Sequence, residues 1–355
     1  MKIASLVSGG VDSSVTIHLL KEQGYDPHIF YIKIGLQDDP AWVDCPAEED
    51  IEIVTWLAKK YGCPLEVISL QEEYWERVIS YTIETVKMGL TPNPDMMCNK
   101  MIKFGAFDEK YGHDFDLIST GHYASTLHID GEKYLATARD HFKDQTYFLG
   151  QINRQQLAKL VFPLGDLVKG DVRRIADEAR LPSAQRKDSQ GICFLGKINY
   201  NDFIKRYVGT NPGSIVDAET GKVLGQHEGL WFHTIGQRRG LGLSGGPWFV
   251  VDKDIRRNRV LVSNGYAPDG QYKKVVNLAH FQFINGHTDR NYDTAQEVKF
   301  KIRHQPEFNE GTLQRQGDSY VIESQQRLQG VAPGQFGVVY TPDSAICLGS
   351  GVIVV

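Results

Sequence analysis

Seven residues near the N-terminus, Ser8–Ser14, constrain the fold of this chain more than any other stretch. They read Ser-Gly-Gly-Val-Asp-Ser-Ser, with the apolar run Ile3–Val7 before them and apolar residues at helical spacing after them. This pattern predicts a strand, a glycine turn and a helix. Two glycines let the backbone approach a phosphate closely, and the N–H groups of a helix N-terminus point at the anion. With the hydroxyl groups of Ser8, Ser13 and Ser14 as further donors, the stretch predicts a polyanion site.

The loop differs from two common phosphate-binding motifs. It lacks the Gly-Lys-Ser/Thr ending of a Walker loop, and no third glycine follows with the spacing of the dinucleotide fingerprint. All seven residues resemble the PP-loop of the ATP pyrophosphatases, which cut ATP between the α- and β-phosphates and leave AMP on an oxygen of their substrate. The alternative is a glycine turn that only closes a strand. The flanking strand and helix favour the phosphate site, and the resemblance implies ATP as its ligand.

Strands and helices alternate through the first part of the chain. Apolar runs at Ile29–Ile34, Leu65–Leu70 and Leu117–Thr120 predict buried strands. Between them, helical spacing of apolar residues predicts helices over Glu48–Tyr61 and Glu73–Met88. This alternation predicts an α/β fold built on a doubly wound parallel sheet, which binds ligands at the carboxyl ends of its strands. The glycine loop lies at that edge.

The pattern of the chain changes beyond about Thr210. Helical spacing disappears, glycine turns become frequent and short β-rich runs dominate. We therefore predict three domains within the 355 residues. A catalytic PP-loop domain spans residues 1–208, a small central domain of mixed or β structure spans 209–274, and a C-terminal β-barrel spans 275–355.

The lengths of the apolar runs and the spacing of the cysteines indicate the cellular compartment of the protein. No apolar run approaches the roughly 20 residues that span a bilayer, and the N-terminus enters a strand without a cleavable signal pattern. The five cysteines are widely spaced and form no Cys-x-x-Cys pair, so neither a disulfide framework nor a zinc ribbon is expected. We expect a cytoplasmic protein with free thiols and no membrane segment.

The formal net charge of -5 argues mildly against a nucleic-acid partner, but local basic stretches decide where a phosphate backbone can lie. Basic residues cluster at Arg238-Arg239, Lys253 to Arg259, Lys273-Lys274 and Lys299 to Arg303. Each cluster alone is typical of a solvated face. Together they favour a polyanionic partner.

Two cysteines lie in loops where a reactive thiol is expected. Cys98 follows Pro92 and Pro94, which stiffen its loop, and a helix is predicted to begin just after it. A thiol near a helix N-terminus supplies more thiolate. Cys193 lies in a glycine-containing loop, Asp188–Phe194, far along the sequence but within possible reach in space. The other three cysteines are expected to be small buried hydrophobic residues: Cys45, Cys63 and Cys347.

Six motifs, in order, resemble those of the bacterial tRNA-specific 2-thiouridylases, which sulfurate the wobble uridine of some tRNAs. The resemblance extends over essentially the whole chain. Its motifs are Ser8–Ser14, Thr91–Asp95 with Cys98–Lys100, Thr120–Tyr123, Lys143–Gln145, Asp188–Phe194 and Thr234–Leu241. It implies an ATP-dependent tRNA sulfurtransferase whose central domain binds tRNA.

The same resemblance implies a role for each matching residue. Cys98 is the catalytic nucleophile, Cys193 takes up sulfur as a persulfide, and Asp95 is the catalytic aspartate. The implied ATP-binding positions are Leu6, Val7, Ser8, Gly9, Gly10, Val11, Asp12, Ser13, Ile32 and Gly121. The implied tRNA-binding positions are Asn93, Pro94 and Asp95 for the target base, with Lys143, Asp144, Gln145, Arg303 and His304.

The chain departs from the family pattern at three positions. Met101 stands where an acidic residue is usual, Ser125 where a basic residue is frequent, and His304 where tyrosine is common. The last difference falls on one of the implied tRNA contacts.

The implied chemistry accounts for both the phosphate loop and the thiols. A uridine C2 carbonyl is a poor electrophile, so ATP must first convert its oxygen to an adenylate. A persulfide then attacks C2 directly, or Cys98 releases it as sulfide and leaves a Cys98–Cys193 disulfide that a reductant reopens. The sequence leaves both routes open. Mg²⁺ is expected to neutralise the pyrophosphate, with Asp12 a candidate ligand and no dedicated metal site.

The implied partners are wobble-uridine tRNAs for Lys, Glu and Gln, and a sulfur-donor protein, either a cysteine desulfurase or a sulfur carrier. Two other functions fit part of the pattern. A PP-loop ligase or amidotransferase that uses ammonia needs no thiols, and AMP formation that depends on added tRNA separates it from a sulfurtransferase. A catalytically silent tRNA-binding protein needs neither Asp12 nor both thiols, and it would show no ATP turnover with tRNA and a sulfur source.

Overall fold

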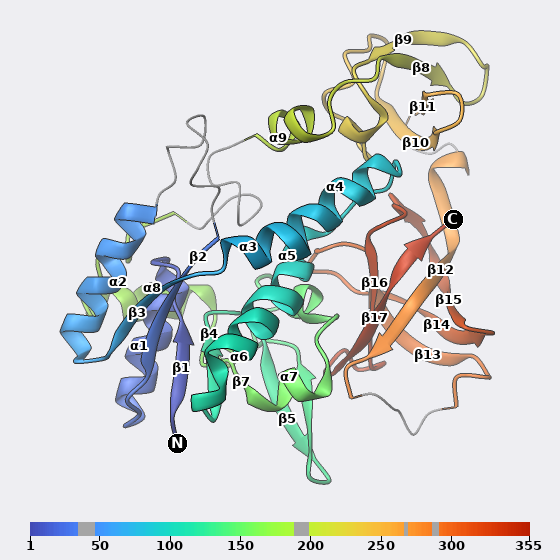
Figure 1. Ribbon diagram of the computed structural model, residues 1–355. Helices are drawn as coiled ribbons and strands as arrows, with labels where there is room; N and C mark the ends of the chain where they lie inside the picture. Colours follow the sequence, from blue (N-terminus) through green and yellow to red (C-terminus); the bar gives the residue numbers. More distant parts are fainter. Residues whose placement is uncertain (35–46, 188–198, 266–268, 286–290) are drawn as a thin grey trace.

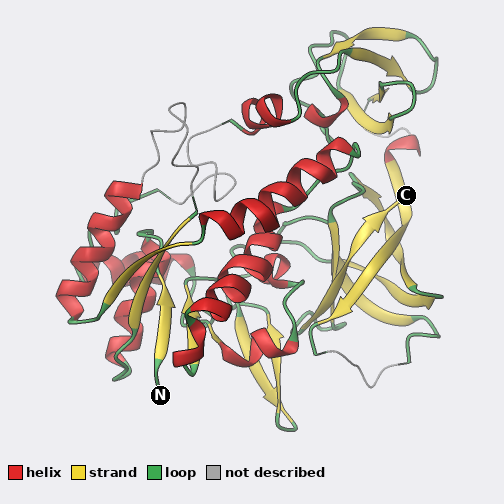
Figure 2. Ribbon diagram, in the orientation of Figure 1, coloured by secondary structure: helices red, strands yellow, loops and turns green. Residues whose placement is uncertain are grey.

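Three packed units make up the described chain, and they confirm the predicted fold class. The computed structural model describes residues 1–34, 47–187, 199–265, 269–285 and 291–355. An α/β unit comes first, a small four-stranded sheet follows, and a closed barrel ends the chain (Figure 1). Figure 2 shows that most helices belong to the first unit, whereas strands dominate the other two. Within these residues, no helix combines the length and the apolar character needed to cross a membrane.

The first unit is built on a parallel five-stranded sheet in the order β3-β2-β1-β4-β7. Its strands are β1 (Ile3–Leu6), β2 (His28–Lys33), β3 (Leu65–Ser69), β4 (Leu117–Thr120) and β7 (Leu160–Val161). The strand order reverses between β1 and β4. The carboxyl ends of these two strands therefore border the crevice where such sheets bind ligands.

Helices cover both faces of this sheet, because side chains alternate along its strands. Ile29 and Tyr31 pack with α1, α2 and α8, whereas Phe30 faces the other side and packs on Phe107 of α6. The sheet is therefore doubly wound, as predicted. The helices are α1 (Val11–Glu22), α2 (Ala47–Tyr61), α3 (Gln71–Tyr74), α4 (Ser80–Lys87), α5 (Pro94–Cys98), α6 (Phe107–Lys110), α7 (Arg154–Lys159), α8 (Lys169–Glu178) and α9 (Tyr200–Tyr207).

Two π-helical segments join shorter helices into longer rods. The segment η2 (Trp75–Ile79) lies between α3 and α4, inside the single helix predicted over 73–88, and η3 (Asn99–Ala106) joins α5 to α6. Such segments are frequent at functional sites. The second one begins directly after Cys98.

The helix that carries Cys98 begins earlier than predicted. It starts at Pro94 and not after the cysteine. Asn93 is the N-cap, and its side chain accepts a hydrogen bond from Met96 N at 3.1 Å. Proline is tolerated at the first helical position because the N–H it lacks would have no intrahelical partner. The Pro-Asn-Pro segment therefore starts a helix rather than extending a loop.

The remaining elements are mostly β-strands. A hairpin that the sequence pattern did not indicate, β5 (Ser125–Ile129) with β6 (Glu132–Ala136), extends from the first unit. The central sheet contains β8 (Gly213–Asp217), β9 (Val223–His227), β10 (Trp248–Asp254) and β11 (Arg259–Asn264). The closed barrel contains β12 (Tyr272–Phe283), β13 (Gln296–Lys301), β14 (Asn309–Gln316), β15 (Ser319–Gln329), β16 (Phe336–Tyr340) and β17 (Cys347–Val354). The domain limits at 208/209 and 274/275 stay predictions, and β12 begins slightly before the second.

The barrel and the first unit share one hydrophobic core. Phe336 and Tyr340 of β16 belong to the same buried cluster as Met96, Cys98 and Tyr147 of the first unit. Gln151 Nε2 also donates to Ser350 O at 3.0 Å across this junction. The barrel is therefore part of the framework that holds the helix of Cys98, and it is not an independent module.

Two lysines of the predicted basic clusters are directed inward, which corrects the idea that these clusters are uniform surface patches. Lys253 Nζ donates to Gly89 O at the end of α4, at 2.9 Å, and burial lowers the pKa of Lys253 to about 8. Lys301 has no exposed side-chain surface and forms an ion pair with Asp144, with Nζ and Oδ2 3.5 Å apart. Both cations connect one unit to another.

We expect Lys301→Met to lower the free energy of unfolding by about 3–5 kcal/mol, because it leaves the Asp144 carboxylate buried without its cation. The measurement is the shift of the urea unfolding midpoint. The double variant Asp144→Asn with Lys301→Met removes both charges and should recover most of the loss. A single variant that unfolds at the parental midpoint would show that the pair does not hold the barrel in place.

Candidate functional site

The predicted phosphate loop joins β1 to α1, as a strand, a turn and a helix. Gly9 has a φ of +77°, and a Cβ at this position would lie 3.0 Å from Asp50 Cα. Both facts require glycine there. Gly10 is the N-cap of α1, and no side chain of the described residues caps the helix at this end. The N–H groups of the first turn are therefore available to an external acceptor such as a phosphate.

The serine hydroxyls of this loop are used differently from the prediction. Ser13 Oγ and Ser14 Oγ donate to Gly10 O at 3.1 and 2.9 Å. Ser13 Oγ also accepts from Ser8 N at 3.2 Å. These two hydroxyls brace the turn, whereas Ser8 is exposed. Recognition of an anion at this loop would rest on backbone N–H groups and on Ser8.

The other residues implied to bind ATP lie at the same edge of the sheet. Leu6 ends β1 and Val7 follows it, Ile32 is near the end of β2, and Gly121 follows β4. A Cβ on Gly121 would lie 2.8 Å from Ser13 N, so only glycine lets the end of β4 approach the first turn of α1. The fold thus gathers these positions around one crevice, and their contact with ATP stays a prediction.

Asp12 makes contacts that sequence reasoning missed. Its carboxylate accepts hydrogen bonds from Lys169 Nζ at 2.7 and 2.9 Å and from Tyr123 OH at 2.9 Å. The side chain of Lys169 is 16% exposed, so its ammonium is held beside the phosphate loop. One signal was available in the sequence: a phosphate loop without the Walker lysine implies a cation from elsewhere in the chain. Lys169 is placed to be that cation.

A metal ion would find few ligands here. No cluster of three potential ligands occurs among the histidine, cysteine and acidic side chains that the structure describes. A Mg²⁺ that enters with ATP takes most of its ligands from phosphate and water and needs only one or two carboxylates. Asp12, with 32% of its side chain exposed beside the loop, fits that limited requirement.

Cys98 is buried at the end of α5. It is 2% exposed, and its neighbours in the core include Ile102 and Phe104. Asp95, which lies one turn earlier on the same helix, is partly exposed. Cys63 and Cys347 are also free and buried, in agreement with the prediction. Cys98 differs from these two by lying beside a partly exposed acid on a helix that the barrel supports.

The barrel holds the segment that precedes Cys98, through a residue that lies in none of the predicted motifs. Gln335 Nε2 donates to Pro92 O at 2.6 Å, and Asn93 Nδ2 donates to Gln335 Oε1 at 3.3 Å. Asn93 and Pro94 are buried. Of the three residues implied to contact the target base, Asp95 is the one with an accessible side chain. The only sequence signal for Gln335 is the Pro-Gly turn directly before it.

Asp144 has a structural role within the segment Lys143–Gln145. Its carboxylate is buried and accepts from Ala138 N at 3.0 Å and from Thr146 Oγ1 at 2.7 Å, besides its ion pair with Lys301. Lys143 and Gln145 are partly exposed. A contact of this segment with tRNA stays a prediction, and it would involve Lys143 and Gln145 rather than the carboxylate.

His304 lies against the same segment. Its Nε2 is 3.1 Å from Asp144 O and donates to it, and its ring lies on Phe148 with centroids 4.7 Å apart. Desolvation against this segment lowers the pKa of His304, which disfavours its charged form. Arg303 is exposed, and its planar guanidinium suits a phosphate group. Of the two implied tRNA contacts on the barrel, Arg303 is the one that can attract a phosphate.

A run of contacts joins the phosphate loop to Asn99, the residue next to Cys98. Tyr123 bonds to Asp12 through its hydroxyl, and its N–H donates to Gln145 Oε1 at 2.9 Å. His304 then links Asp144 to Phe148, and Asn99 Nδ2 donates to Phe148 O at 3.1 Å. Asn99 is the residue after Cys98. Cys193 and the rest of Asp188–Phe194, like Cys45, lie outside the described residues.

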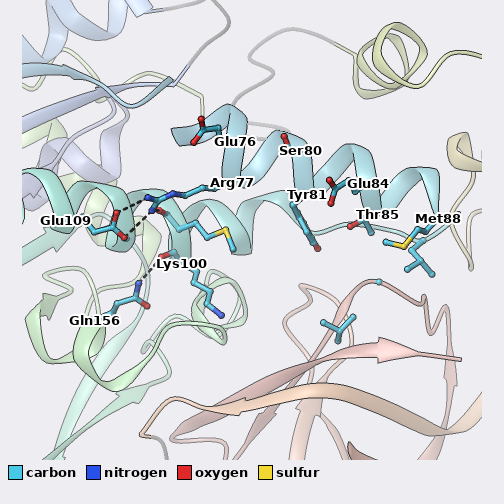
Figure 3. A pocket seen from close by; sticks show the side chains of 15 residues that line it. Glu76, Arg77, Ser80, Tyr81, Glu84, Thr85, Met88, Lys100, Glu109 and Gln156 are labelled. Atoms are coloured by element: carbon cyan, nitrogen blue, oxygen red, sulfur yellow. Dashed lines mark hydrogen bonds and ion pairs between the residues drawn. The ribbon is translucent and has the colours of Figure 1, made fainter. Parts of the chain in front are cut away.

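A pocket of about 670 Å³ lies between α4, η3 and the barrel. Figure 3 shows the side chains that line it. Arg77 and Glu109 form a two-bond ion pair in its wall, with N–O distances of 2.9 and 3.2 Å. Lys100 Nζ donates to the side-chain oxygens of Gln151 and Gln282. None of the described residues that line this pocket is a predicted site residue, although Lys100 belongs to the motif that contains Cys98.

Three family models match the chain in succession. They are described as tRNA methyl transferase HUP domain over residues 1–197, tRNA methyl transferase PRC-barrel domain over 201–264, and Aminomethyltransferase beta-barrel domain over 274–353. The three matches follow the order of the three structural units.

Curated relatives match the whole chain. The tRNA-specific 2-thiouridylase MnmA of Parabacteroides distasonis is 64% identical over 354 residues, covering 100% of this chain and 99% of the relative. The MnmA of Porphyromonas gingivalis is 60% identical over 357 residues, and MnmA 1 of Bacteroides thetaiotaomicron is 56% identical over 354, each covering 99% of both chains. Identity at this level over full length leaves no unit of the chain unmatched, and the chain belongs to the tRNA-specific 2-thiouridylase family.

Proposed function

We propose that this chain is an ATP-dependent tRNA-uridine 2-sulfurtransferase. It adenylates the C2 oxygen of the wobble uridine and replaces that oxygen with sulfur to give 2-thiouridine, releasing AMP and pyrophosphate. The observation that carries this proposal is the run of contacts from Asp12 to Asn99, because it joins a phosphate loop to the helix of a cysteine. The names of the full-length relatives support the same reaction.

The phosphate loop would hold the nucleotide while the uridine oxygen attacks the α-phosphorus and the bond to the β-phosphate breaks. Pyrophosphate leaves toward the N-terminus of α1, where backbone N–H groups stabilise its charge. Lys169 supplies a cation at the same place. Mg²⁺, when bound with ATP, would further neutralise the pyrophosphate, with Asp12 as its protein ligand.

Sulfur transfer can proceed by either of two balanced routes. In one, the terminal persulfide sulfur of Cys193 attacks C2, AMP leaves with the oxygen, and the Cys98 thiolate then attacks the Cys193 sulfur to free the thiouridine. In the other, Cys98 attacks first and releases sulfide, which displaces AMP. Both leave a Cys98–Cys193 disulfide, which an external dithiol reduces. Because Cys98 is 2% exposed, both need the turn around it to open.

The proposed substrates are wobble-uridine tRNAs for Lys, Glu and Gln, and the proposed sulfur source is a cysteine desulfurase or a sulfur carrier. The names of the full-length relatives support tRNA as the substrate, and the tRNA set and the sulfur source are part of the proposal. The test combines the purified chain with ATP, Mg²⁺, unmodified tRNA and a persulfide source, followed by mass analysis of the nucleosides. The expected product is 2-thiouridine, with AMP formed only when tRNA is present. AMP formation without tRNA would instead indicate a ligase that uses a small substrate.

We expect Arg303→Ala to weaken tRNA binding and to make the slope of log affinity against log salt shallower by about one unit, because one phosphate contact is lost. The measurement is filter binding at several salt concentrations. Arg315→Ala serves as the matched control, because it removes the same charge from an exposed position on β14, and it should keep the parental slope. An unchanged slope for Arg303→Ala would remove this residue from the RNA interface. Deleting the whole barrel is not a clean test, because the barrel shares its core with the first unit.

A further inference from the structure

We infer that Phe142 is a stacking platform for an unpaired nucleobase of the bound tRNA. This inference rests on the proposed function and extends it to a residue outside the predicted motifs. Single-stranded RNA is commonly recognised by aromatic side chains on which splayed bases stack. Phenylalanine has no polar atom on its ring, so a platform of this kind would accept different bases.

Phe142 is unusually exposed for its size. Its side chain is 78% exposed, and among the large apolar residues that the structure describes only Val355, at the end of the chain, is more exposed. Burying a phenylalanine typically stabilises a protein by about 1.5–3 kcal/mol, which this position forgoes. An isolated exposed apolar residue needs no explanation on its own. The geometry of its loop supplies the further argument.

The loop around Phe142 is held by specific hydrogen bonds. Asp140 Oδ1 accepts from both Phe142 N and Lys143 N at 3.2 Å, and Asp140 Oδ2 accepts from Lys169 N at 2.8 Å. Lys143 N also donates to Asp140 O at 3.1 Å. The turn is therefore fixed by one carboxylate that binds three backbone N–H groups. Such a turn fixes the backbone that carries the exposed ring, so little backbone entropy is left to lose on binding.

The same bonds fix Phe142 relative to the candidate site. Lys169, whose backbone N–H binds Asp140, binds Asp12 of the phosphate loop through its side chain. On the other side of the turn, Gln145 N donates to Tyr123 O at 2.8 Å and Asp144 O accepts from His304. The platform thus lies on a loop tied both to the phosphate loop and to the barrel. The loop that carries Phe142 is therefore part of the framework of the candidate site.

The charged residues next to Phe142 in the sequence favour RNA over a protein partner. Arg139 and Lys143 flank Phe142 closely in sequence, whereas the one carboxylate of the turn, Asp140, is directed to the backbone and to the start of α8. Basic residues close in sequence to an exposed aromatic ring suit a phosphate backbone with a stacked base. An acidic or neutral surround would have suited an apolar protein surface better.

The test measures tRNA affinity at fixed salt for Phe142→Ala, Phe142→Leu and Phe142→Trp. Alanine removes the ring, leucine keeps apolar bulk without a π face, and tryptophan enlarges the face. We expect Phe142→Ala and Phe142→Leu to weaken binding about 5- to 150-fold, and Phe142→Trp to bind at least as tightly as the parent. The salt slope should stay parental, because no charge changes. Leu127→Ala, an exposed apolar position on the β5–β6 hairpin, is the matched control and should bind as the parent does.

The outcomes separate this inference from the proposed function. If the parent binds and thiolates tRNA while both the alanine and leucine variants bind with parental affinity, the platform is wrong and the function stands. If Phe142→Leu binds as the parent does and only Phe142→Ala is weakened, stacking is also excluded. If the variants bind tRNA normally but lose sulfur uptake from a cysteine desulfurase, the ring contacts a protein and the RNA assignment falls. A parent that neither binds nor thiolates tRNA would overturn both.

Discussion

Replacing Cys98 by serine should abolish tRNA thiolation, with a loss of at least about a thousandfold, while sulfur from a labelled donor still reaches Cys193. A serine hydroxyl is not ionised at neutral pH and cannot take part in thiol–disulfide exchange, so neither proposed route can be completed. Serine is close to cysteine in size, which limits the disturbance of the core around this buried position. The measurements are nucleoside mass analysis and retention of radiolabelled sulfur on the protein.

Cys63→Ser is the matched control, because Cys63 is another free and buried cysteine. Burial raises the pKa of the Cys63 thiol, so it stays protonated and unreactive. We expect this variant to thiolate tRNA at the parental rate. Cys193→Ser should retain no label at all. Parental thiolation by Cys98→Ser, or label that persists on Cys193→Ser, would show that the two roles are assigned wrongly.

Changing Asp12 to asparagine should reduce AMP and pyrophosphate formation by about 10²–10³-fold and leave tRNA affinity within about twofold. Asparagine keeps the shape of the side chain but removes its charge. The Lys169 ammonium then loses the carboxylate that holds it at 2.7 Å beside the phosphate loop, and a Mg²⁺ that entered with ATP would lose its proposed protein ligand. The basic residues expected to contact RNA are untouched. Release of labelled pyrophosphate and filter binding of tRNA measure the two effects.

Asp26→Asn is the matched control for this variant. Asp26 forms an exposed ion pair with Lys21 at the other end of α1, so the same change of charge occurs near the same helix but away from the phosphate loop. We expect parental AMP formation from it, because exposed ion pairs contribute little. If Asp12→Asn releases AMP at the parental rate, the loop is not the ATP site.

Local sequence patterns predicted the first unit well, because they describe contacts between residues near one another in the chain. The apolar runs around Ile29 and Leu65 became adjacent strands, and the glycine loop follows β1 as expected. The helix around Cys98 was placed too late, because its start depends on a cap at Asn93 and on proline at the first helical position. The same two prolines are also typical of a stiff loop, and the sequence pattern alone does not distinguish a helix start from such a loop.

What the sequence determined by itself is the chemistry available: a phosphate loop, two cysteines in separate motifs, and a change from α/β to β-rich structure. Only the tertiary structure decided which side chains meet. Asp12 pairs with Lys169, and Asp144 pairs with Lys301, each across 157 residues of sequence. No periodicity connects such positions, since their approach depends on how the sheet, the helices and the barrel pack around shared cores. For the same reason the sequence predicts Lys301 to be a surface charge, whereas in the fold it forms a buried ion pair with Asp144.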